Sequence, residues 1–281
     1  TRKIDSLKSA LLYAKEDTNK FRLYYNIAGE YWIGLKDTID YPNTYKYEDS
    51  AIQLARKLNY TYGIFDALMC YGNVYAYQEK YLESSKYYNQ AIETAKLLGD
   101  KKIVGDSYLE AADNFFAYGN DAKKYRLNFP ISLDFNFNAL KTYESIGNKY
   151  YMAKSWLKIG RTYSWQNFFS MGKGNSLEVE KCGLKALQLF EDSKIQQQVD
   201  IISCKFLLGR ANYFQRKYAK ALTLFYECVK YYKDSSDKVN LSSTYLNIGR
   251  IYRALGDSSV AKGNKEYAKK MFTEALKYLG L

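Results

Sequence analysis

Three arginines at matching places along the chain are the residues best suited to do chemistry. Arg161, Arg210 and Arg250 each directly follow a glycine, within segments that share one spacing of small and aromatic residues. A guanidinium group can bind a carboxylate or a phosphate through two parallel hydrogen bonds. If the three segments stack in register, the arginines would converge on one anionic group. The alternative is a solvated charged face that nearby acidic residues partly neutralise.

The residue types argue against other kinds of site. The chain contains no histidine, which removes the commonest general base and histidine-based nucleophile or zinc arrangements. Its cysteines lie far apart without Cys-x-x-Cys spacing, and we interpret them as buried small apolar residues: Cys70, Cys182, Cys204 and Cys228. The segment from Met171 to Ser176 lacks the spacing of a phosphate-binding loop. We predict that the protein is not an enzyme and holds neither cofactor nor metal.

The elements that would position the arginines repeat six times. A small residue recurs in a first helix, followed three residues later by an aromatic residue except at Asn212, and a second small residue follows in a second helix. The first set is Ala28, Gly72, Ala112, Gly160, Gly209 and Gly249, and the second is Ala51, Ala91, Ala139, Ala186, Cys228 and Ala275. Small residues let two helices approach closely, so each unit is expected to be a helix pair.

We predict an all-α fold, with one repeat domain over residues 1–281 and an extra N-terminal helix near residues 4–15. The six predicted pairs cover residues 19–58, 61–98, 102–146, 149–192, 197–233 and 238–279. Pro130 is expected in the first turn of its helix, where a missing N–H breaks no helical bond. Extra residues are expected in turns between paired helices, at 33–43, 120–129, 171–177 and 258–266.

This pattern resembles the tetratricopeptide repeat (TPR) family. Second helices of that family carry two small residues seven positions apart, which Ser84 and Ala91 match here, as do Ala268 and Ala275. With a core period of 40 residues, the chain is similar to the long-helix subclass found in kinesin light chains and bacterial regulators. The resemblance implies a right-handed α-solenoid whose first helices line a concave groove.

On that resemblance, the groove residues are those beside the small first-helix residues or within about one turn of them. Asn247 matches a position where an asparagine of kinesin light chain repeats contacts the backbone of a bound peptide. The predicted binding residues are Asn73, Asp113, Lys154, Lys158, Arg161, Phe206, Arg210, Tyr213, Asn247, Arg250 and Arg253. The groove would change from neutral or acidic to basic along the chain.

The net charge of +12 is concentrated in the second half of the chain. Residues 1–140 contain 18 basic and 18 acidic side chains, whereas residues 141–281 contain 24 and 12. An electrostatic partner should therefore favour the second half. Basic charge with many aromatic residues leaves nucleic-acid binding as an alternative function. We do not favour it, because acidic residues alternate with the basic ones on most expected second helices.

A helical repeat without a catalytic constellation predicts a scaffold that binds a protein or peptide segment. An acidic group would suit its basic half, and another domain of the same polypeptide would serve equally as partner. By resemblance, the context is the sensory or regulatory region of a larger bacterial signalling protein. The start without Met and the end just after the last repeat helix indicate a fragment.

No apolar run is long enough to span a membrane. The sequence leaves two expectations for the cellular compartment. The chain would be extracytoplasmic, in the periplasm, if a signal peptide has been removed, and cytoplasmic otherwise.

Overall fold

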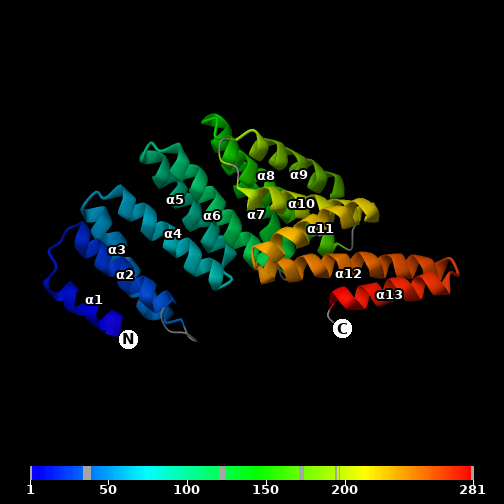
Figure 1. The fold of residues 1–281 in the computed structure, drawn as a ribbon. Coiled ribbons are helices and arrows are strands. Elements are labelled where there is room, and N and C mark those ends of the chain that lie inside the picture. Colours follow the sequence, from blue (N-terminus) through cyan, green and yellow to red (C-terminus); the bar gives the residue numbers. More distant parts are fainter. Residues whose placement is uncertain are drawn as a thin grey trace. The chain divides into compact units, whose positions relative to one another are not determined.

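Thirteen α-helices make up the part of the chain that the structure describes, with no strand among them (Figure 1). The structure is a computed structural model, and it describes residues 2–33, 39–119, 124–170, 174–193, 195 and 197–279. Consecutive helices pack as pairs, which confirms the predicted all-α repeat. No helix in these ranges is long and apolar enough to cross a membrane.

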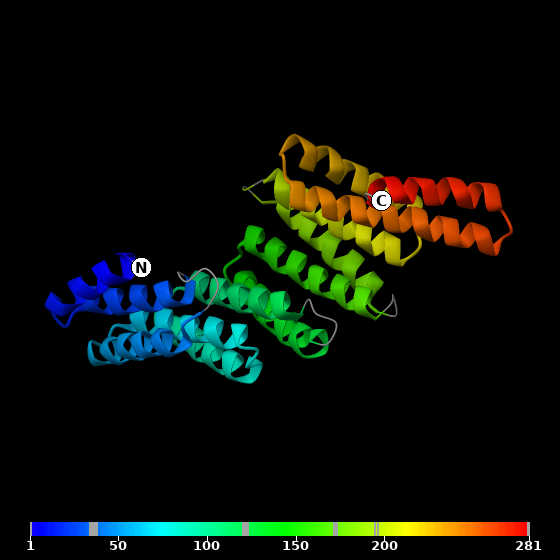
Figure 2. The same cartoon turned by 90° about the horizontal axis from the view of Figure 1, so that it is seen from below.

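The helices fall into two compact units, residues 1–146 and 147–281. The first unit contains α1 (Arg2–Tyr13), α2 (Thr18–Ile33), α3 (Tyr41–Lys57), α4 (Thr61–Tyr77), α5 (Tyr81–Leu97), α6 (Lys101–Gly119) and α7 (Tyr125–Ser145). The second contains α8 (Lys149–Phe169), α9 (Ser176–Glu191), α10 (Gln198–Phe214), α11 (Tyr218–Asp234), α12 (Lys238–Ala261) and α13 (Lys265–Leu279). Figure 2 shows the same helices from below. That all of them form one domain stays a prediction.

Small residues stand where paired helices come closest, as the repeat pattern predicts. A Cβ on Gly72 of α4 would lie 2.7 Å from the ring of Tyr88 of α5. A Cβ on Gly209 of α10 would likewise lie 2.8 Å from the ring of Phe225 of α11. The aromatic ring of one helix therefore occupies the space that a larger residue on its partner would need.

A hydrogen bond also joins some of these pairs near the same point. The Ser84 hydroxyl donates to the Gly72 carbonyl at 2.8 Å. In the next pair, Ser132 donates to the Ala112 carbonyl at the same distance. Both hydroxyls are buried, so the bonds satisfy polar groups inside the interface.

Two predicted boundaries were wrong. Pro130 lies inside α7, which begins at Tyr125, rather than in its first turn. Phe129 is fully buried before it, and packing of this kind offsets the backbone bond that proline removes. Likewise, α12 continues to Ala261, through the first four residues of the predicted turn at 258–266, and Gly256 just before them lies against the ring of Phe272. Residues 34–38, 120–123 and 171–173 of the other predicted turns lie outside the described residues.

Three first helices of the second unit carry the candidate site. Helix α10 contacts α8 on one side and α12 on the other, and α11 packs against both α10 and α12. The core beneath contains Phe225 of α11 with Ile248 and Ile251 of α12, all fully buried. This packing holds α8, α10 and α12 side by side, so that equivalent positions of successive repeats face one space.

Candidate functional site

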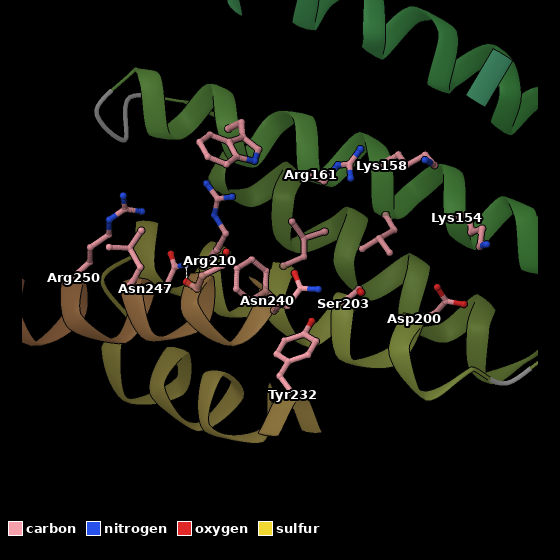
Figure 3. A pocket seen from close by; sticks show the side chains of 16 residues that line it. Lys154, Lys158, Arg161, Asp200, Ser203, Arg210, Tyr232, Asn240, Asn247 and Arg250 are labelled. Carbon is pink, nitrogen blue, oxygen red and sulfur yellow. Dashed lines mark hydrogen bonds between the residues drawn. The ribbon is translucent and has the colours of Figure 1, made fainter. Parts of the chain in front are cut away.

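A cavity of about 430 Å³ opens between α8, α10 and α12 (Figure 3). We call it the basic cavity, because its charged lining residues are five basic ones and a single acidic one. The charged residues are Lys154, Lys158, Arg161, Arg210, Arg250 and Asp200. The others are Leu157, Trp165, Ser203, Phe206, Leu207, Tyr232, Asn240, Ser243, Leu246 and Asn247. Apolar walls with a few convergent charges are typical of ligand sites, and this volume suits a small molecule or a short piece of a longer ligand.

Arg210 is the most deeply placed cation of the basic cavity. Its side chain leaves α10 with only 7% of the residue exposed. Its guanidinium lies 4.8 Å from the ring of Trp165, and Nη2 donates to the Ser164 carbonyl at 3.3 Å. Burial, with a smaller contribution from Arg250, lowers the pKa of Arg210 to about 10. The guanidinium is therefore still charged at neutral pH, and it lies over an aromatic ring.

Arg250 repeats this arrangement on α12. Its guanidinium lies 4.7 Å from the ring of Phe168 of α8, and burial lowers its pKa. Arg210 and Arg250 are close enough to repel each other, which adds to the lowered pKa of Arg210. Within the described ranges, neither arginine forms an ion pair with a carboxylate. Two confined positive charges without a carboxylate partner favour binding of an anion.

The single carboxylate of the cavity belongs to Asp200 at the start of α10, and it is already engaged. Its Oδ2 accepts a hydrogen bond from the Tyr150 hydroxyl at 3.0 Å. Lys154 lies 4.7 Å from the Tyr150 ring. Burial acts to lower the pKa of Lys154, but Tyr150 and Asp200 outweigh it and leave this pKa raised. Asp200 therefore balances Lys154 at one end of the cavity, whereas Figure 3 shows Arg210 and Arg250 at the other.

Seven of the eleven predicted binding residues line the basic cavity. They are Lys154, Lys158, Arg161, Phe206, Arg210, Asn247 and Arg250. Tyr213 and Arg253 instead line a second hollow that also includes Arg250. The register of the repeat thus brings most of the predicted residues of the second unit into one space. That they bind a ligand stays a prediction.

Asn73 and Asp113 lie in the other unit, on α4 and α6. Asn73 is engaged by neighbouring side chains, since its Oδ1 accepts bonds from Tyr88 and, at 2.8 Å, from Asn114. Its Nδ2 donates to Glu110 at 3.3 Å. The structure therefore does not place these two residues in the basic cavity.

Several lining residues were not predicted. Trp165 lies one helical turn after Arg161, and Asp200, Ser203 and Asn240 lie early in their helices. A search extended by one further turn along each first helix would have found Trp165. Tyr232 comes from α11, a second helix, and no spacing within the first helices could have indicated it.

No protein-family profile and no curated protein sequence matches the chain. Among solved structures, it is similar to a signal transduction ATPase with numerous domains (STAND) from Pyrococcus horikoshii, which has a tetratricopeptide repeat sensor. The TM-score is 0.70 at 17% identity, over 98% of this chain and 38% of that one. The chain thus spans well under half the length of the STAND protein.

Two further solved structures are similar. RapI in its apo form gives a TM-score of 0.62 at 14% identity, over 92% of this chain and 97% of that one. Aspartyl phosphate phosphatase F from Bacillus subtilis gives 0.55 at 17% identity, over 98% and 68%. Identities this low show the fold alone. The chain has a tetratricopeptide-like helical repeat fold, as predicted, and its assignment to the long-helix subclass stays a prediction.

Proposed function

We propose that this chain is a non-catalytic regulatory domain that binds an acidic segment of a protein or peptide in the basic cavity. The observation that carries the proposal is the pair Arg210 and Arg250, each held against an aromatic ring of α8 and neither in an ion pair with a carboxylate of the described residues. A bound carboxylate would relieve their mutual repulsion and accept hydrogen bonds from both guanidinium groups.

The size of the cavity decides how much of a ligand it would hold. A volume of about 430 Å³ accommodates one or two side chains with their backbone, but not a folded domain. The partner would therefore insert a short segment. The lining amides and hydroxyls, such as Asn240, Ser243 and Asn247, would be available for polar contacts along it.

A regulatory role is favoured by the resemblance to the TPR subclass that occurs in bacterial regulators and by one similar structure. The STAND protein from Pyrococcus horikoshii carries a tetratricopeptide repeat sensor within a longer chain. By analogy, this chain would serve as the sensory part of a larger bacterial signalling protein. The acidic segment would then come from a separate protein or from another domain of the same polypeptide.

The proposal is tested by selecting peptides from a random displayed library on the intact chain and measuring their affinity by calorimetry. We expect selected peptides to be rich in Asp and Glu. The double variant Arg210→Gln/Arg250→Gln should bind them at least about tenfold more weakly, because two charge-assisted contacts are lost.

The matched control is Lys220→Gln/Lys230→Gln, which removes the same charge from exposed positions of α11 outside the basic cavity. It should change affinity by less than about twofold, since exposed distant charges are screened. Selected peptides without acidic residues, or equal affinity for the arginine variant and the wild type, would refute the proposal.

A further inference from the structure

A second hollow of about 540 Å³ adjoins the basic cavity at Arg250, the one residue of the described ranges that lines both. We call it the aromatic hollow, because four rings line it: Phe168, Tyr213, Phe214 and Tyr218. It lies where α10 ends and α11 begins, beside the middle of α12. A ligand that contacts Arg250 in the basic cavity therefore lies beside a residue that also lines the aromatic hollow.

The rings of the aromatic hollow form a connected group. The centroid of Tyr213 lies 5.4 Å from that of Phe214 and 6.1 Å from that of Tyr218. Phe168 lies beneath the Arg250 guanidinium, and Tyr213 is close enough to Arg250 to raise the pKa of its guanidinium against the effect of burial. The hollow is thus bounded by ring faces and edges at distances typical of aromatic packing.

The charges of the aromatic hollow differ from those of the basic cavity. Arg253 lies 3.9 Å from the carboxylate of Asp257, one turn further along α12. A second acidic group of a ligand would therefore be repelled by Asp257, whose carboxylate already neutralises Arg253. Arg216 and Arg250 would still present guanidinium planes, which stack well on an aromatic ring.

We infer that the acidic segment bound in the basic cavity continues past Arg250 and places an aromatic side chain in the aromatic hollow. This inference rests on the proposed function and adds the sequence feature that the segment must have, an aromatic residue close to an acidic one. An aliphatic side chain would bury apolar area there, but only a ring would gain both ring–ring and guanidinium–ring contacts.

The test uses synthetic peptides with blocked ends, each containing one glutamate and one phenylalanine separated by zero, one or two glycines. Companion peptides carry alanine in place of phenylalanine, or glutamine in place of glutamate. Affinities for the intact chain are measured by calorimetry. At the best spacing, the Glu/Phe peptide should bind about tenfold more tightly than its Glu/Ala companion, the range expected for one well-packed aromatic contact.

Variants of the aromatic hollow test whether the tighter binding of the Glu/Phe peptide arises there. In Tyr213→Ala, the ratio of Glu/Ala to Glu/Phe dissociation constants should fall from about ten to below about two. Because Tyr213 is half-buried and its loss could disturb folding, Arg216→Gln, at an exposed position of the lining, provides a second variant and should reduce the ratio about threefold. Lys262→Gln, an exposed residue outside the lining, should leave the ratio as in the wild type.

Two results would overturn the inference, and they are distinguishable. If Glu/Phe and Glu/Ala peptides bind equally at every spacing, yet both bind more weakly to Arg210→Gln/Arg250→Gln, the aromatic hollow is not used and the proposed function stands. If no peptide shows any dependence on those two arginines, the proposed function fails and the inference fails with it.

Discussion

Burial shifts the pKa of one ionisable side chain in each unit and so decides whether that side chain is charged at neutral pH. In the second unit, Arg210 is almost inaccessible, and burial lowers its pKa. It is still charged at neutral pH, because the lowered pKa is about 10. In the first unit, Glu48 on α3 is 1% exposed, and burial raises the pKa of this carboxyl from 4.5 to about 8. Arg210 is therefore charged at neutral pH, whereas Glu48 changes charge near pH 8.

Glu48 should make stability depend on pH. Burial is the main cause of its raised pKa, with Asp49 and Asp66 adding to it and the Cys70 thiol opposing it. Between pH 4.5 and 8 the folded chain keeps a proton that the unfolded chain has released, so this group lowers stability progressively as the pH rises through that range. Glu48→Gln should therefore stabilise the fold at pH 8 by about 1–3 kcal/mol and much less at pH 5.

Denaturant unfolding at pH 5 and pH 8 measures this difference. Glu83→Gln, which removes an exposed carboxyl of the same unit, serves as the control and should show the pH dependence of the wild type. If Glu48→Gln gives the same pH dependence as the wild type, then the pKa of Glu48 is not raised in the folded chain, and its carboxyl is not buried as described.

At the scale of helices, the contact between paired helices depends on residues without a side chain. The ring of Tyr88 covers Gly72, and the ring of Phe225 covers Gly209. In both pairs the ring comes from the second helix, which explains why a small residue recurs in the first helix. The helix pair is thus specified locally, whereas the loops between helices can vary in length with little effect on it.

Two glycine substitutions test this packing. Gly72→Ala should destabilise the chain by about 1–3 kcal/mol, because the new methyl group would lie 2.7 Å from the Tyr88 ring. Gly29 lies inside α2, one residue after Ala28, which is the equivalent of Gly72, and a Cβ on Gly29 would meet open space. Gly29→Ala should therefore stabilise the chain by about 0.5–1 kcal/mol, the usual gain of alanine over glycine inside a helix. Thermal unfolding would measure both, and equal effects would contradict the explanation.

At the scale of the whole molecule, the excess of basic residues does not by itself indicate nucleic-acid binding. Surface lysines of the second unit lie beside carboxylates in several places. Lys205 lies 2.5 Å from Glu227, and Lys181 lies 3.4 Å from Glu178. Such pairs interrupt the continuous positive track that a nucleic-acid backbone requires.

We therefore expect no salt-sensitive retention of single-stranded or double-stranded DNA or RNA in filter binding at two salt concentrations. A steep loss of retention between about 50 and 200 mM salt, by orders of magnitude, would instead support nucleic-acid binding. The double variant Arg210→Gln/Arg250→Gln would then show whether the basic cavity takes part.

The sequence by itself determined the helix pairs, their number and most of their limits, because spacing of small and aromatic residues is a local property that helical geometry converts directly into packing. It also indicated that Arg161, Arg210 and Arg250 share a register. It failed at Pro130 and at the end of α12, where burial of Phe129 and of the contact between Gly256 and Phe272 outweighs the local preference for a turn.

Only the tertiary structure decided what surrounds those arginines. Asp200 is held by Tyr150, Trp165 and Phe168 support the two guanidinium groups, and Tyr232 reaches the basic cavity from a second helix. These neighbours come from different repeats, so their proximity depends on how helices stack rather than on spacing along one helix. The same stacking leaves Arg210 and Arg250 without a carboxylate partner among the described residues, which is the physical basis of the proposed anion site.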